Sequence, residues 1–154
     1  MKKVFFTAIL LTAGIVTLSA QQVVYSFIGW TPWGSLQIRN AGDGIVVSGT
    51  TSSNSGIAIE TRNPGLGGRN RIILEISGIT ETDDFDVGKL VKLEINNVAR
   101  SDTGGNMNRN DPEYLNARNG EYIFDISALR DIRKIELVFH KCTVKSLRID
   151  MFVE

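Results

Sequence analysis

The sequence predicts an all-β protein, an antiparallel two-sheet β-sandwich. Three observations predict this class: about nine short runs rich in Val, Ile and aromatic residues, turn-forming Gly, Asn and Ser between them, and apolar/polar alternation in the later runs. Such alternation is typical of strands with one face on a core and one face in solvent. Because the sequence has no long amphipathic helix to cover a parallel sheet, we expect two sheets that pack face to face.

Residues 1–20 have the pattern of a secretory signal peptide. Two lysines precede an apolar run over residues 4–16, and the small residues Ser19 and Ala20 stand before the expected cleavage point. The run is shorter than the roughly 20 apolar residues that a membrane span needs. We therefore expect a secreted or periplasmic protein with no membrane span, whose single β-sandwich domain comprises residues 21–154.

The first strands are less regular than the later ones. They are expected where Val, Ile and aromatic residues cluster between Gly, Asn and Ser, over residues 23–30, 35–40, 44–50, 56–62 and 71–77.

Four later runs alternate cleanly and predict which side chains face the core. The strands are expected over residues 91–95, 122–127, 134–139 and 146–154. Their expected inward positions are Val91, Leu93, Ile95, Tyr122, Phe124, Ile126, Ile135, Leu137, Phe139, Leu147, Ile149, Met151 and Val153. A single helical turn capped by Ser127 is the only helical candidate.

Charge and cysteine content exclude some classes of function. The chain has 17 basic and 17 acidic residues, so it lacks the basic excess that a nucleic-acid partner favours. The lone Cys142 has no partner for an internal disulfide. Cys142 is expected to be a small, half-buried strand residue. The alternative is a dyad with His140, since positions 140 and 142 share a face of an extended strand.

Two polar segments have oxygen donors that suit calcium. Within residues 100–120 these donors are Asp102, Asn106, Asn108 and Asp111, and calcium takes six to eight oxygen ligands. Residues 81–86 hold a second acidic cluster. In both segments the alternative is a solvated loop whose Asp and Asn side chains stabilise turns.

Two tryptophans lie close together in the stretch FIGWTPWG. Trp30 and Trp33 flank Pro32, which disfavours a central strand and indicates a strand end or loop. An exposed indole is an efficient platform for the apolar face of a sugar ring. Burial of both tryptophans is the alternative. Strand parity makes Trp33 the better candidate for exposure.

The predicted outer face of the two last strands carries a second candidate binding surface. If those strands are neighbours, the side chains that gather on it are His140, Arg148, Asp150 and Phe152. Such a patch suits a sugar or a protein partner, and an ordinary solvent face is the alternative.

The segment GEYIFDISALRDIRKIELVFHKCTVKSLRIDMFVE, residues 120–154, resembles the end of secreted jelly-roll carbohydrate-binding modules of galactose-binding-like architecture. The resemblance implies a non-catalytic module that binds polysaccharide or oligosaccharide, often with a structural calcium. It rests on a packing pattern rather than on a binding motif.

Three functional classes stay open. The first is a carbohydrate-binding protein that is not an enzyme. The second is a structural or adhesive protein within a surface assembly, because a sandwich hosts many functions. The third is a small glycan-active enzyme, for which the sequence offers carboxylates but no triad or zinc-ligand set.

Overall fold

The computed structural model describes residues 21–60 and 66–154 and has a single antiparallel sheet of ten strands. The predicted all-β, antiparallel class is confirmed. The predicted signal peptide, residues 1–20, lies outside the described residues.

The strands differ greatly in length. They are β1 (Val23–Val24), β2 (Thr31–Trp33), β3 (Gln37–Ala41), β4 (Gly44–Glu60), β5 (Arg71–Ser77), β6 (Asp84–Phe85), β7 (Lys92–Ile95), β8 (Val98–Ala99), β9 (Gly120–Asp125) and β10 (Lys134–Val153). A 3-10 turn, η1 (Asp86–Gly88), follows β6. The main path through the sheet runs β2-β4-β10-β5-β9.

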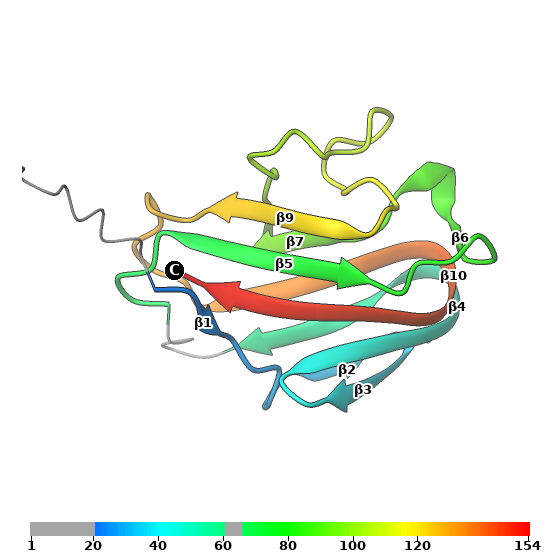
Figure 1. Cartoon of the computed structure of the whole chain (residues 1–154), viewed down its shortest axis with the longest axis horizontal. Coiled ribbons are helices and arrows are strands. Elements are labelled where there is room, and N and C mark those ends of the chain that lie inside the picture. The colour runs from blue at the N-terminus through cyan, green and yellow to red at the C-terminus, as the bar shows by residue number, and fades with distance from the viewer. Residues whose placement is uncertain (1–20, 61–65) are drawn as a thin grey trace, which may run out of the picture.

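Two long strands, β4 and β10, pair with each other along most of their lengths and hold the sheet together. The pairing begins with Lys134 opposite Glu60 and ends with Ile149 opposite Ile45. The first part of β10 also pairs with β7, and its last part pairs with β5. Figure 1 shows that the long pair bends over, so that β7 and the first part of β10 lie behind β5 and the last part of β10.

The bend coincides with irregularities in the pairing. The register shifts between His140 and Cys142 and again between Val144 and Leu147, and Lys141 has a left-handed φ of 42°. Extra residues of this kind bend a strand and increase its twist. The expected strands 44–50 and 56–62 are joined in one bent strand, β4, as far as Glu60, and the rest of 56–62 lies outside the described residues. The expected strands 134–139 and 146–154 are likewise joined in β10, and the described residues form one sheet where two were expected.

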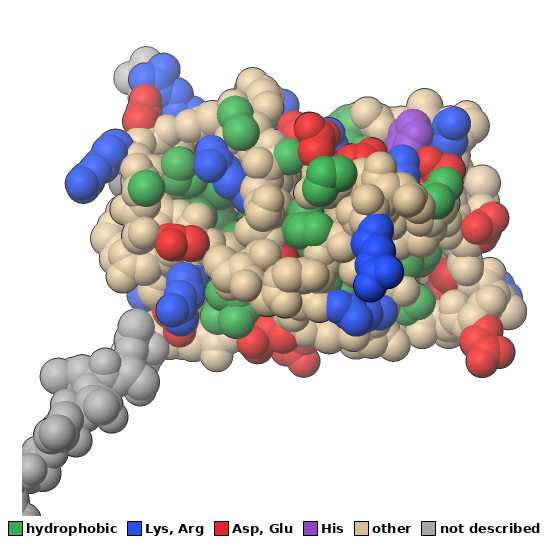
Figure 2. All heavy atoms as spheres, turned by 90° about the horizontal axis from the view of Figure 1, so that it is seen from above, with side chains coloured by type: hydrophobic (Ala, Val, Ile, Leu, Met, Phe, Trp, Pro, Cys, Tyr) green, Lys and Arg blue, Asp and Glu red, His purple; other side chains and the backbone are tan. Residues whose placement is uncertain are grey.

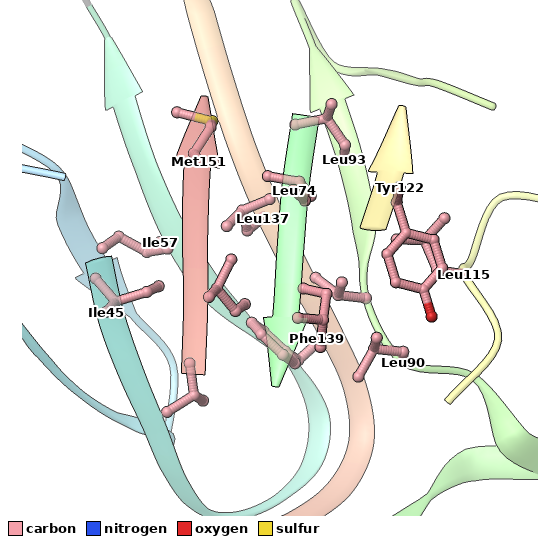
Figure 3. Packing of buried hydrophobic residues seen from close by; sticks show 14 of the residues in the cluster. Ile45, Ile57, Leu74, Leu90, Leu93, Leu115, Tyr122, Leu137, Phe139 and Met151 are labelled. Atoms are coloured by element: carbon pink, nitrogen blue, oxygen red, sulfur yellow. The ribbon is translucent and has the colours of Figure 1, made fainter. Parts of the chain in front are cut away.

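The core lies between the two parts of the folded sheet. Ile45, Leu137 and Met151 are fully buried and come from both parts of the long strands, and Figure 3 shows them packed with Leu74, Leu93 and Tyr122. All thirteen predicted inward side chains are buried. The expected turn of helix at Ser127 is instead a non-helical turn closed by Leu129 N–H donating to Ile126 O.

Candidate functional site

The two tryptophans occupy different environments. Trp30 is buried, with 7% of its surface exposed, and its ring packs 5.0 Å from that of Phe27. Trp33 ends β2 and is half-buried. Because β2 ends the main strand path and is bonded there only to β4, Pro32 is accommodated in it without loss of a central ladder bond.

The indole of Trp33 packs against the backbone of β4 at a glycine. Trp33 is the register partner of Gly56 in β4, and a methyl group added at Gly56 would lie 3.1 Å from Trp33 Cζ2. Gly56 is in turn opposite Val138 of β10, so the indole sits on the outer face of the rear part of the sheet. Val138 is 4% exposed although it points away from the core.

An open groove of about 570 Å³ runs beside Trp33. It is lined by the aromatic ring of Trp33, the hydroxyl of Thr31, the ammonium of Lys134 and the carboxylates of Glu60 and Glu136. The small residues Ala58 and Gly29 complete the lining. The register explains this composition, because Thr31, Ala58 and Glu136 form one cross-strand row and Glu60 and Lys134 form the next. The volume falls within the usual range for small-ligand sites.

Lys134 organises the charges of the groove. Its Nζ lies 3.0 Å from Glu136 Oε2 and 3.7 Å from Glu60 Oε1. The neighbouring Glu136 carboxylate raises the pKa of the Lys134 ammonium. With two carboxylates and one ammonium, the groove carries a net charge of minus one.

The sequence pattern pointed to Trp33 but not to the rest of the groove. Glu136 was expected to be an ordinary solvent-facing strand residue, yet it is 7% exposed and lies opposite Glu94 of β7. Alternation places Lys134 and Glu136 on one face, which was the only available signal. Their proximity to Trp33 depends on the pairing of β2 with β4 and of β4 with β10, which a single sequence does not reveal.

The predicted patch on the last strands is divided between the two parts of the sheet. His140 pairs with Asn54 in the rear part, whereas Arg148 pairs with Val46 and Phe152 pairs with Ile73 in the front part. The bend of β10 lies between them. Arg148 and Asp150 remain together, because the guanidinium donates two hydrogen bonds of 2.6 Å to the carboxylate.

His140 belongs to a polar cluster beyond the groove. Its Nδ1 lies 2.7 Å from Asn54 Oδ1 and its Nε2 lies 3.8 Å from Asp86 Oδ2. Asp86 also pairs with Lys89 at 3.0 Å, which lowers the pKa of the Asp86 carboxyl group. In Figure 2 the histidine, in purple, lies among acidic and basic side chains.

His140 and Cys142 do not form the dyad that an extended strand would allow. The register shift between them places Cys142 in the core, where it is 2% exposed, while His140 faces outward. Burial raises the pKa of the Cys142 thiol to about 11. The thiol is therefore protonated at neutral pH and is not an activated nucleophile.

The expected calcium ligands of residues 100–120 make hydrogen bonds within the protein. Asp102 is buried, and its Oδ1 accepts from Ile123 N–H at 2.7 Å while its Oδ2 accepts from Asn106 N–H at 2.9 Å. Thr103 N–H also donates to Ile123 O at 2.7 Å. The loop thus occupies the backbone groups of Ile123 on the free edge of β9.

The other two predicted ligands lie further along the same loop. Asn108 is buried and its Oδ1 accepts from the N–H groups of Asn110 and Asp111, at 2.8 and 3.0 Å. Asp111 Oδ2 lies 3.4 Å from Lys89 Nζ. These are the turn-stabilising roles of the alternative interpretation, and calcium binding here stays a prediction.

The acidic residues of the cluster at 81–86 likewise do not gather at one site, and each has its own surroundings. Asp83 accepts from Lys145 N–H at 2.8 Å and from Thr80 N–H at 2.8 Å, Asp84 is exposed in β6, and Asp86 pairs with Lys89. Within residues 21–60 and 66–154, no three His, Cys, Asp or Glu side chains converge as a metal-binding group.

Comparison with protein-family models and with curated proteins finds no match to this chain. In the part of the chain that the structure describes, no helix has the length and apolar character to cross a membrane.

Proposed function

We propose that this protein is an exported, non-catalytic carbohydrate-binding protein and that the groove beside Trp33 is its sugar site. The observation that carries the proposal is a half-buried indole on the wall of an open groove whose other side chains are polar or charged. We further propose that the folded sheet is a β-sandwich of the jelly-roll type, as the resemblance of residues 120–154 implies.

The lining of the groove suits the two sides of a sugar ring. A pyranose presents apolar C–H groups on its faces, which pack on an indole, and hydroxyl groups at its edge, which need hydrogen-bonding partners. Trp33 supplies the first, and Thr31, Glu60, Lys134 and Glu136 supply the second. The groups are held before any ligand arrives, because Lys134 is already engaged by both carboxylates.

The charge of the groove favours a neutral glycan. Two carboxylates face one ammonium, and that ammonium is shared between them. A uronic acid or sulfated sugar would bring another negative charge to a site that is already negative, which is unfavourable. We therefore infer neutral oligosaccharides or polysaccharides as the ligand class.

The proposal is tested by titrating residues 21–154 with soluble neutral glycans, such as xylan, mixed-linkage glucan and glucomannan, and following tryptophan fluorescence. A polygalacturonate titration is the charged comparison, and each titration is run with and without calcium. We expect a saturable shift with at least one neutral glycan and none with polygalacturonate. A calcium requirement would support the predicted metal site.

Three variants sharpen the test. Trp33→Ala removes the platform and is expected to abolish the shift, whereas Phe152→Ala alters the other part of the sheet and leaves the shift unchanged. Trp33→Phe keeps an aromatic face and removes a buried indole N–H that has no acceptor among the described residues. This variant should therefore fold well and retain part of the affinity. Wild-type affinity in Trp33→Ala, or no response to any glycan, would overturn the proposal.

One observation favours the second candidate function, a component of a protein assembly. An apolar row crosses four strands on the outer face of the front part of the sheet, from Val24 through Phe152 and Ile73 to Ile123. Val24 is 48% exposed. If this function is correct, the protein associates with itself as its concentration rises, and Phe152→Ser prevents that association. Light scattering over a range of protein concentrations is the test.

A further inference from the structure

A second hollow of about 440 Å³ adjoins the Trp33 groove and shares two of its residues. Glu60 and Lys134 line both, and the second hollow continues to Asn96, Asn97, Asp131 and Arg133. The shared residues place the two hollows side by side along the rear part of the sheet, and together we call them the path. Both hollows are open rather than enclosed.

The far end of the path is built on the hairpin between β7 and β8. Asn96 and Asn97 have φ values of 52° and 62°, as the two central residues of a tight hairpin require. Asn96 Oδ1 accepts from the N–H groups of Arg133 and Lys134, at 2.8 and 3.1 Å. The hairpin is therefore tied to the start of β10, and the amide of Asn97 is presented beside Lys134.

Lys134 lies at the junction of the two hollows. Its Nζ donates to Asn97 Oδ1 at 3.2 Å, in addition to its contacts with Glu136 and Glu60. Val138, whose row includes Trp33, is four residues further along β10, which corresponds to about 13 Å of strand. The row of Lys134 and Glu60 is therefore about 13 Å along the sheet from the row of Trp33, and the groove that both rows line extends beyond one sugar ring.

We infer that the path binds an extended oligosaccharide of at least three rings, with one ring on Trp33 and the chain crossing Lys134 to reach Asn97 and Arg133. This inference rests on the proposed sugar-binding function and specifies the length of its ligand. The guanidinium of Arg133 is largely exposed, with 75% of its side-chain surface accessible, and lies 2.6 Å from Asp131. It is therefore free to donate further hydrogen bonds to ring hydroxyls.

The test is a chain-length series. Residues 21–154 are titrated calorimetrically with cello-, xylo- and manno-oligosaccharides from the disaccharide to the hexasaccharide. Affinity is expected to rise steeply between the disaccharide and the tetrasaccharide and to level off beyond it.

Removing one neutral hydrogen bond at the far end should lower affinity by about fivefold.

Two variants test the far end, and a third serves as a control. Asn97→Gly keeps the positive φ and removes the amide, and Arg133→Ala removes the guanidinium; both should weaken hexasaccharide binding and leave disaccharide binding unchanged. Arg39→Ala, at an exposed position of β3 in the other part of the sheet, should change neither. Asn97→Gly and Arg133→Ala are both checked for wild-type melting temperature.

The outcomes separate this inference from the proposed function. Equal affinity for disaccharide and hexasaccharide, with binding still lost in Trp33→Ala, would overturn the extended path and leave the sugar site intact. Wild-type hexasaccharide affinity in both Asn97→Gly and Arg133→Ala would do the same. Absence of binding to every oligosaccharide would overturn both.

Discussion

Gly56 lies directly opposite Trp33 in the pairing of β4 with β2, and the indole rests where a side chain would otherwise stand. A methyl group at Gly56 would also lie 2.2 Å from Leu137 O. The backbone of Leu137 belongs to the central strand pair and cannot move away cheaply.

Gly56→Ala is therefore expected to destabilise the protein by about 1–3 kcal/mol, the usual cost of overpacking. Urea denaturation measures this change in the free energy of unfolding. Gly67→Ala is the matched control, since a methyl group there meets no atom of the described residues within 4 Å. Equal stability of the two variants would show that the contact at Gly56 is not tight.

Asp102 is expected to protect the free edge of β9. Asp102→Ala leaves the Ile123 N–H without its acceptor, at a cost of about 1–3 kcal/mol, and exposes an unpaired strand edge that favours self-association. Asp102→Asn retains one acceptor and should show a smaller loss. Urea denaturation and light scattering measure the two effects, with the exposed Asp84→Ala as control. A monomeric, fully stable Asp102→Ala variant would contradict this role.

Stability is expected to fall in alkaline solution. Burial raises the pKa of Cys142 from 9.0 to about 11 and also raises the pKa of Tyr122. Above the unfolded-state pKa values the unfolded chain loses protons that the folded protein keeps, so the free energy of unfolding decreases as pH rises. This penalty is absent below the unfolded pKa of the thiol.

The measurement is the urea midpoint from about pH 8 to about pH 10, where the thiol is the first of these groups to ionise in the unfolded chain. Cys142→Ala removes one of the titrating groups and should flatten the decline. The wild-type thiol should also react slowly with a maleimide until the protein is unfolded. A decline of the same slope in both proteins would exclude Cys142 as a contributor.

Lys141 adopts the left-handed conformation at the bend of β10, with a φ of 42°. The left-handed conformation costs a non-glycine residue about 1–2 kcal/mol of folding free energy. Glycine avoids this cost, but its greater freedom in the unfolded chain costs about 0.5–1 kcal/mol relative to alanine. Lys141→Gly is therefore expected to leave stability unchanged or to raise it slightly. Lys145→Gly, at an exposed site of the same strand without a positive φ, should lower it. Thermal melting compares the two, and an equal loss in both would contradict this account.

The alternating runs predicted the core because strand periodicity is local information. Ile135, Leu137 and Phe139 are buried as expected, and so are Leu147 and Ile149 beyond the bend. The continuity of β10 was not evident from the sequence, since only two apolar residues, Cys142 and Val144, stand among the polar residues of 141–146. That error also joined His140 with Arg148 in one expected patch.

Of the residues in the candidate site, only Trp33 was predictable from the sequence. Strand parity made Trp33 the better candidate for exposure, and the structure has Trp30 at 7% exposure and Trp33 half-buried. Glu60 and Glu136 reach the groove through pairings of residues far apart in the sequence. Information of that kind is not contained in composition or periodicity.

The central position of β10 has a consequence for how the chain acquires its structure during synthesis. β10 pairs with β1, β4, β5, β6 and β7, and some of its contacts with β4 join residues about 100 positions apart, so most pairing is non-local and slow to form. Until Val153 has left the ribosome, the strands made earlier lack their common neighbour. We expect a nascent chain of this topology to stay incompletely folded, and accessible to chaperones, until β10 is complete.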